Sequence, residues 1–190
     1  MGHIVFKQGS YGTEADSWNE TRPDLDKAKR KKPLGNTSVP KVTPITILVD
    51  TREQLPWHFG PSVTVERCKL DAGDYSLKGF TGRVAIERKS LDDLAQTISW
   101  GRERFEAELQ LLRQYEFRAI VVEASMEDAR LGRYESRTHP SAVIGSTIAF
   151  WHDCGCPTIW AGNPAHAADV VERLFRRMVE KAMFRRKDDE

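Results

Sequence analysis

Three acidic residues and one lysine stand where the sequence predicts strands to begin, run or end. Asp50 follows the β-branched apolar run 45–49, and Asp74 opens a later extended stretch. Glu87 and Lys89 are two residues apart on a third predicted strand, so they share one face of it. Placing a carboxylate and an ammonium next to a buried core costs desolvation energy, which favours a functional reason for their presence.

The chemistry that these four residues favour is metal-assisted hydrolysis of a phosphodiester. Asp50, Asp74 and Glu87 offer carboxylate oxygens, the ligands that Mg²⁺ or Mn²⁺ prefers. Such a cation lowers the pKa of a bound water and holds a phosphoryl oxygen. Lys89 would orient the water or stabilise charge on the phosphate. On spacing alone, a surface edge with an ordinary ion pair between Glu87 and Lys89 explains such a pattern more often than a metal site does.

A longer pattern surrounds these residues. It consists of Val-Asp-Thr-Arg-Glu at 49–53, Gly-Asp-Tyr at 73–75, and Glu-Arg-Lys at 87–89 followed by Asp93. A Gly-Asp pair, a variable gap, Glu-Arg-Lys, three residues and Asp resemble the signature of the XPF-family nuclease domain. That family belongs to the PD-(D/E)XK, restriction-endonuclease-like superfamily. The resemblance extends over about residues 45–161.

This resemblance implies a role for each matching residue. Asp50, Asp74 and Glu87 would be metal ligands, and Lys89 would be the catalytic lysine. Four further residues would support the site: Arg52, Glu53, Arg88 and Asp93. Members of the family cut branched, forked or flapped DNA with Mg²⁺ or Mn²⁺, and many act as dimers. The resemblance therefore implies DNA as the partner, with a homodimer as one expected assembly.

Two other functions stay open at this point. One is a non-catalytic DNA-binding or scaffold domain of the same fold, although such relatives typically lose the acidic residues or the lysine that are present here. The other is a restriction-type or recombination nuclease with a different substrate. The sequence shows neither a tandem helix-hairpin-helix region nor a helicase region, so we expect a stand-alone nuclease domain of the kind found in bacteria or phages.

A mixed β-sheet flanked by helices would position these residues. Short apolar or alternating runs predict strands at 45–49, 62–68, 74–78, 83–89, 118–124 and 156–160. Apolar residues at helical spacing predict helices after the cap Ser90, after Gly101, over 140–153 and from Asn163-Pro164 onward. This order predicts an α/β protein with a restriction-endonuclease-like core.

Several residues outside the pattern have two interpretations. Arg102 opens a helix beside the predicted site, and we favour a phosphate contact over an ordinary surface arginine. Asp93 has the spacing of a helix cap to Ser90, so capping and site support are equally expected. Tyr75 and Trp100 could stack on a splayed base, but aromatic residues in such places more often belong to the core, which is our expectation.

Composition sets the domain organisation and the compartment. The chain has 190 residues, which is enough for one domain. Its net charge is +1. We divide it into a flexible basic arm at 1–43, a nuclease domain at 44–187 and an acidic end at 188–190. The arm carries a basic cluster that fits DNA contact or a solvated linker equally well, namely Lys29, Arg30, Lys31 and Lys32.

No apolar run approaches the length of a membrane span, and the first 20 residues lack the apolar region of a signal peptide. Three cysteines are an odd number, which fits a reducing compartment. His152, Cys154 and Cys156 have no partnering pair of ligands, so buried thiols are favoured over a soft-metal site. We expect a cytoplasmic, nucleoid-associated protein without a membrane partner, or one in the host cytoplasm if a phage encodes it.

Overall fold

The computed structural model describes residues 43–188, with side chains as far as residue 182. The basic cluster Lys29, Arg30, Lys31 and Lys32 and the last two residues of the predicted acidic end therefore lie outside the described residues. Within the described part, no helix is long and apolar enough to cross a membrane.

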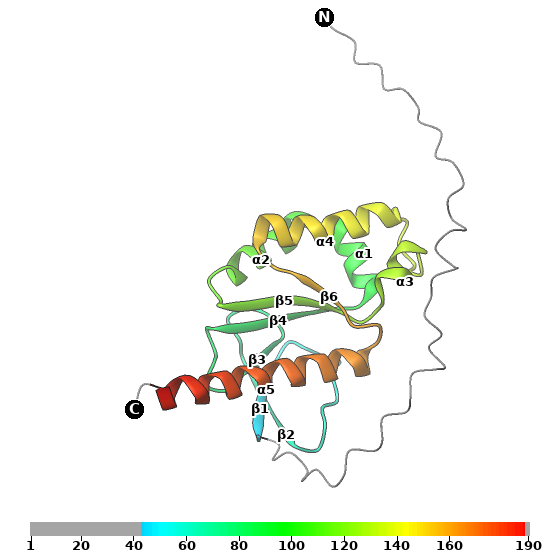
Figure 1. Ribbon diagram of the computed structural model, residues 1–190. Coiled ribbons are helices and arrows are strands. Elements are labelled where there is room, and N and C mark those ends of the chain that lie inside the picture. The colour runs from blue at the N-terminus through cyan, green and yellow to red at the C-terminus, as the bar shows by residue number, and fades with distance from the viewer. Residues whose placement is uncertain (1–42, 189–190) are drawn as a thin grey trace, which may run out of the picture. The chain divides into compact units, whose positions relative to one another are not determined.

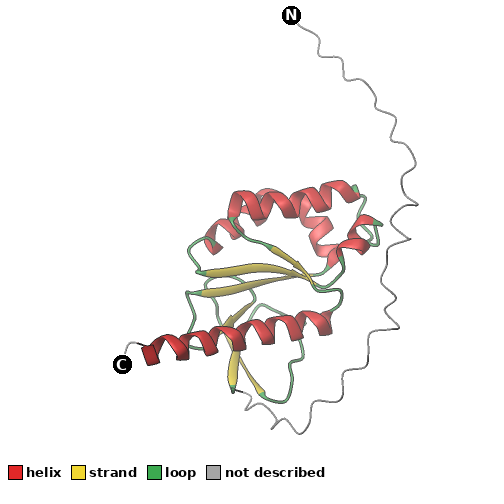
Figure 2. Cartoon of the chain, in the orientation of Figure 1, coloured by secondary structure: helices red, strands yellow, loops and turns green. Residues whose placement is uncertain are grey.

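A six-stranded mixed sheet forms the centre of the domain (Figure 2). Its strands are β1 (Ile45–Asp50), β2 (Val63–Cys68), β3 (Tyr75–Leu77), β4 (Val84–Lys89), β5 (Phe117–Val122) and β6 (Thr158–Trp160). They lie in the order β2-β1-β3-β4-β5-β6. Strand β3 is antiparallel to both of its neighbours, whereas the outer pairs are parallel. The predicted strands and the mixed α/β sheet are confirmed.

Helices cover both faces of this sheet (Figure 1). One face carries α1 (Leu91–Trp100), α2 (Arg102–Leu112), α3 (Met126–Arg130) and α4 (Pro140–Cys154), and the long helix α5 (Pro164–Asp188) crosses the other. Ser90 caps α1 as predicted, because its hydroxyl oxygen accepts a hydrogen bond from the Asp93 backbone N–H. Gly101 separates α1 from α2.

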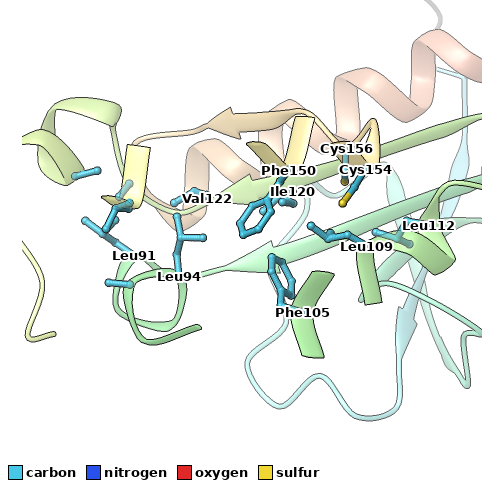
Figure 3. Close-up of a cluster of buried hydrophobic side chains, with 14 of the residues drawn as sticks. Leu91, Leu94, Phe105, Leu109, Leu112, Ile120, Val122, Phe150, Cys154 and Cys156 are labelled. Atoms are coloured by element: carbon cyan, nitrogen blue, oxygen red, sulfur yellow. The ribbon is translucent and has the colours of Figure 1, made fainter. Parts of the chain in front are cut away.

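Each face of the sheet has its own apolar core. Figure 3 shows the cluster under α1, α2 and α4, with Leu91, Leu94, Phe105, Leu109, Leu112, Ile120, Val122, Phe150, Cys154 and Cys156 labelled. The second cluster lies under α5, whose Val171 and Phe175 are fully buried. The buried thiols and the core-facing stripe of the last helix are therefore confirmed, and His152 lies exposed beside Asp153.

The alternation along β4 decides where the candidate site opens. Ala85 belongs to the cluster under α1 and α2, whereas Val84 and Ile86 belong to the cluster under α5. Continuing this alternation brings Glu87 and Lys89 to the α1/α2 face and Arg88 to the α5 face. The sequence predicted the same division.

Candidate active site

The ends of three neighbouring strands meet at one place. Because β3 runs antiparallel to β1 and β4, its first residues lie beside their last ones. The Asp50 N–H donates to the Asp74 carbonyl at 2.8 Å, and the Asp74 N–H donates to the Ile86 carbonyl at 2.8 Å. The Arg88 N–H donates to Asp74 Oδ2, also at 2.8 Å. Backbone pairing thus holds Asp74 between the ends of β1 and β4.

Glycine at position 73 is required by this close approach. Its φ of 73° lies in the left-handed region that disfavours other residues. A Cβ atom there would lie 2.9 Å from the Ile86 carbonyl oxygen. The glycine of the Gly-Asp pair therefore allows the chain to bring Asp74 against β4.

Two half-buried carboxylates share a hollow at this junction. Asp74 and Glu87 line a cavity of about 290 Å³ together with Arg52 and Glu108. Burial, and then repulsion from Asp74, raises the pKa of Glu87 to about 8. Burial also raises the pKa of Asp74 against the opposing hydrogen bond from Arg88. Both carboxyl groups are therefore poorly stabilised as anions by the protein alone.

Lys89 stands next to this pair. Its Nζ lies 3.4 Å from Glu87 Oε1 and 4.4 Å from the centre of the Phe105 ring, so an ion pair and a cation–π contact hold it. Lys89 also lines a second hollow, of about 510 Å³, whose other walls include Asp93 and Arg104. The lysine thus places a positive charge beside the two carboxylates and at an open surface.

Asp50 is directed to different partners. Its side chain is 1% exposed, and Oδ1 accepts 2.8 and 2.6 Å hydrogen bonds from Arg52 N and Nε. Oδ2 accepts from the Leu70 N–H at 2.7 Å. Burial alone would raise the pKa of Asp50, but these hydrogen bonds lower it to about 2. Asp50 therefore fixes Arg52, whose guanidinium reaches the hollow of Asp74 and Glu87.

The predicted set of three carboxylate ligands is not brought together. Within the described part of the chain, no three His, Cys, Asp or Glu side chains lie close enough to hold a metal ion. Asp74 and Glu87 share one hollow, and Asp50 does not line it. The role of Asp50 as a ligand stays a prediction, because a residue's place at a strand end does not determine which partner its side chain takes.

Comparison with known proteins bears directly on this arrangement. The sequence profile of the ERCC4 domain matches residues 49–174. The chain belongs to the ERCC4 domain family. The match includes every residue of the predicted site within the described part, and ERCC4 domains are nuclease domains, so a nuclease core of the predicted kind is confirmed at the level of family and fold.

Two relatives, one of them in two structures, are similar to the chain. A protein of Methanocaldococcus jannaschii whose name describes an ATP-dependent RNA helicase is 29% identical over 140 residues. These are 73% of this chain, but the chain spans only 16% of that relative. The structure of XPF from Aeropyrum pernix matches with a TM-score of 0.56 and 24% identity over 75% of this chain and 69% of XPF. The same protein in complex with DNA matches with a TM-score of 0.54 and 25% identity over 73% and 66%.

On the opposite face of β4 in this ERCC4 domain, two glutamates contact the guanidinium group of Arg88. Its Nε and second terminal nitrogen donate to the two oxygens of Glu123 at 2.7 and 2.9 Å, and Glu53 lies 3.4 Å from its other terminal nitrogen. Trp57 Nε1 also donates to Glu123. Arg88 is thus held beneath the sheet, while its backbone N–H bonds to Asp74; the support of the site by Glu53 and Arg88 stays a prediction.

Sequence reasoning missed Glu123 and Trp57 in this network. The signal for Glu123 was present, because it directly follows the apolar end of β5, just as Asp50 directly follows the apolar run 45–49. Its N–H donates to the Lys89 carbonyl at 2.9 Å, so the two strand ends are neighbours. Glu108 was also missed, and its position in the middle of an amphipathic helix offers no such signal.

Asp93 and Arg102 take structural partners in the ERCC4 domain. The Ser90 hydroxyl donates to Asp93 Oδ2 at 2.7 Å, so Asp93 is part of the helix cap while also lining the hollow beside Lys89. Arg102 donates hydrogen bonds of 2.7 Å to Glu106, on its own helix α2, and to Ser146 on α4. The bond to Ser146 joins the two helices. A phosphate contact by Arg102 stays a prediction, one that would require these bonds to open.

The two aromatic residues differ from each other. Tyr75 is fully buried and stacks on Trp57, as expected of a core residue. Trp100 is 93% exposed, so its expected place in the core is wrong. It lies two residues beyond Ile98 of the apolar stripe, or about 200° around the helix, which turns it away from the core.

Proposed function

We propose that this ERCC4 domain is a metal-dependent DNA endonuclease that hydrolyses phosphodiester bonds in branched, forked or flapped DNA. The observation that carries the proposal is the pair of half-buried carboxylates, Asp74 and Glu87, in one open hollow with Lys89 beside them. Membership of a nuclease family supports the reaction class. A complex of XPF from Aeropyrum pernix with DNA supports the choice of nucleic acid.

The donor set suits Mg²⁺ or Mn²⁺. Mg²⁺ usually keeps several waters and binds through one or two carboxylates plus the phosphates of its substrate, so it does not need three protein ligands. Asp74 and Glu87 repel each other as anions, and a divalent cation between them would relieve that repulsion. When bound, the cation would lower the pKa of a water and polarise the scissile phosphate.

The chain's own residues would do the rest. Water would attack phosphorus, the bond from phosphorus to the leaving oxygen would break, the water would lose a proton to solvent and the leaving oxygen would take one up, so that a phosphate monoester and an alcohol form. Lys89 would orient the attacking water or stabilise the negative charge that develops on the phosphate. Arg52, held in place by Asp50, would contact a non-bridging phosphate oxygen, for which its planar guanidinium is suited.

We also propose that the protein forms a homodimer and acts on chromosomal DNA in the cytoplasm. Dimers are common in the family that the sequence resembles, and sedimentation velocity of the full chain would show whether this member forms one. The basic arm would add contacts to the DNA backbone through the cluster Lys29, Arg30, Lys31 and Lys32, and such contacts weaken steeply as salt increases.

A cleavage panel tests the function. Duplex, single-stranded, flapped, forked and four-way DNA are incubated with the full chain and Mg²⁺, Mn²⁺ or EDTA. We expect cutting only with a divalent cation. Asp74→Asn, Glu87→Gln and Lys89→Met should each lower the rate at least about 100-fold, the scale on which loss of an active-site electrostatic group acts. Glu103→Gln and Asp153→Asn, changes of the same kind at exposed positions, should leave it unchanged.

The outcomes separate the competing functions. Parent-like cutting by all three site variants would show that the site lies elsewhere. Tight DNA binding without cutting under any condition, together with no calorimetric signal for Mn²⁺, would favour the non-catalytic alternative. Cutting confined to paired duplex would favour a restriction-type or recombination nuclease over a junction enzyme.

A further inference from the structure

Trp100 is the most exposed of the large hydrophobic side chains within the described residues, at 93%. It is the last residue of α1, and Gly101 ends the helix directly after it. An exposed indole of this kind loses favourable burial for no structural gain, since neither apolar core includes it. A ligand that covers the ring would provide the missing contact.

The position of Trp100 connects it to the candidate active site. It lines the hollow of about 510 Å³ that also contains Lys89, together with Asp93 and Arg104. It also lines a hollow of about 630 Å³ with Arg137 and Thr138. The indole therefore lines two open hollows, one of which contains the lysine.

The walls of these hollows combine apolar surface with charged groups of both signs, namely Lys89, Arg104 and Arg137 against Asp93 and Glu135. Arg104 is 83% exposed, and its closest carboxylate oxygen, on Glu108, is 3.9 Å away. Arg137 is exposed as well. An apolar protein partner would find one aromatic ring among charges and amides, whereas a nucleotide offers a flat base for the ring and a phosphate for the arginines.

The supporting structure beneath Trp100 is firmly held. The Glu135 N–H donates to Asp92 Oδ1 at 2.8 Å, and Thr138 Oγ1 donates to the Ala95 carbonyl at 2.9 Å. These bonds tie the 135–138 segment to α1. A platform that is ordered before binding loses little entropy when a base stacks on it.

We propose that Trp100 is a positioning residue that stacks on an unpaired nucleobase next to the scissile phosphate, with Arg104 and Arg137 contacting the flanking phosphates. Bases inside a duplex already have both faces covered, so only an unpaired or splayed base can present a face to the indole. The proposal rests on the proposed function and deepens it. The preferred substrate contains a single-stranded segment at the active site.

Binding measured in EDTA tests the stacking independently of cleavage. A fluorescently labelled single-stranded oligonucleotide and the matching duplex are titrated with the full chain. Replacing a stacking aromatic by alanine weakens binding by about 5- to 150-fold per base, so Trp100→Ala should lose that much affinity for the single strand and much less for the duplex. Trp100→Phe should restore most of the affinity, because a phenyl ring also stacks.

Trp151→Ala is the matched control, since Trp151 is 63% exposed on α4 and lines neither hollow. It should bind both DNAs like the parent. The slope of affinity against salt should be the same in Trp100→Ala as in the parent, because no charge is lost. Single-stranded DNA should also quench less tryptophan fluorescence in Trp100→Phe than in the parent.

Three results would overturn the proposal: parent-like binding of single strands by Trp100→Ala, an equal loss for single strand and duplex, or an equal loss in Trp151→Ala. A dimer in the parent that Trp100→Ala converts to a monomer would also overturn it, by assigning the indole to a second copy of the chain. If the parent cuts DNA and Trp100→Ala binds normally, only the stacking fails. If the parent binds no DNA, the proposed function fails with it.

Discussion

Replacing Glu87 by glutamine should stabilise the metal-free protein, and increasingly so as the pH rises from 5 to 8. Burial and the nearby Asp74 raise the pKa of Glu87 from 4.5 to about 8 in the folded state. Below pH 4.5 the carboxyl group is protonated in both the folded and the unfolded chain. Above it, the unfolded chain releases the proton while the folded chain retains it, so stability falls until the pH passes the folded pKa. Glutamine carries no such proton and avoids the loss.

The magnitude follows from this pH window. Each pH unit between the two pKa values costs the parent about 1.4 kcal/mol of unfolding free energy. With 4.5 and about 8 as limits, Glu87 costs the folded state about 1 kcal/mol at pH 5 and about 3 kcal/mol at pH 7. The advantage of Glu87→Gln should therefore grow by about 2–3 kcal/mol between these pH values. For a domain of this size that corresponds to a further increase in Tm of about 5–10 °C.

Urea denaturation of both proteins in EDTA, at pH 5, 6, 7 and 8, measures this change. Comparing the difference in unfolding free energy across pH removes any pH-independent effect of the amide. Glu103→Gln, at an exposed position of α2, is the control, and its effect should stay within about 0.5 kcal/mol. An advantage of Glu87→Gln that stays constant or shrinks as the pH rises would show that the carboxyl group is not destabilised by its surroundings, and the reasoning would be refuted.

Three further changes test the frame of the site. Gly73→Ala should lower the free energy of unfolding by about 1–3 kcal/mol and slow cleavage, because its Cβ would lie 2.9 Å from the Ile86 carbonyl oxygen. Thermal melting and a cleavage assay check this, and a parent-like Tm would contradict it. Asp50→Asn should lower the free energy of unfolding by about 2 kcal/mol at pH 7. This loss should vanish as the pH falls from 3.8 through about 2, where the parent's carboxylate is protonated as well. Urea titrations at neutral and acidic pH measure it, and a pH-independent loss would argue against hydrogen bonds to an ionised carboxylate. Arg88→Ala should cost about 3–5 kcal/mol by leaving Glu123 buried without its partner, whereas a loss under 1 kcal/mol in chemical denaturation would mean that water replaces the guanidinium.

Most of the fold could be predicted from the sequence, because the elements obey simple periodicities. Buried strands such as β1 and β5 are short apolar runs, and alternation along β4 correctly assigns Ala85 and Ile86 to opposite cores. Helix α3 was missed, since its five residues are too few to show an apolar stripe. Trp100 was misplaced for a different reason: aromatic residues in such places usually belong to the core, but its angle around the helix decided its exposure.

The candidate site was only partly predictable. The sequence brings Asp50, Asp74 and Glu87 to neighbouring strand ends, and the structure confirms that these ends meet. Which partner each carboxylate takes is a different question, because it depends on residues far away in the sequence. The Leu70 N–H lies 20 residues from Asp50 and satisfies one of its oxygens, a contact that no local pattern reveals.

Charge is treated in opposite ways on the two faces of β4. Beneath the sheet, Arg88 faces Glu53 and Glu123, so a buried charge is matched by partners of the opposite sign. Above it, Glu87 has Lys89 beside it, but burial and then repulsion from Asp74 raise its pKa. Arg88 shows that a charged side chain of this strand can be given partners of the opposite sign, and Glu87 is not given enough of them. A carboxylate left short of positive charge at an open hollow is a site that a cation and a phosphate would complete.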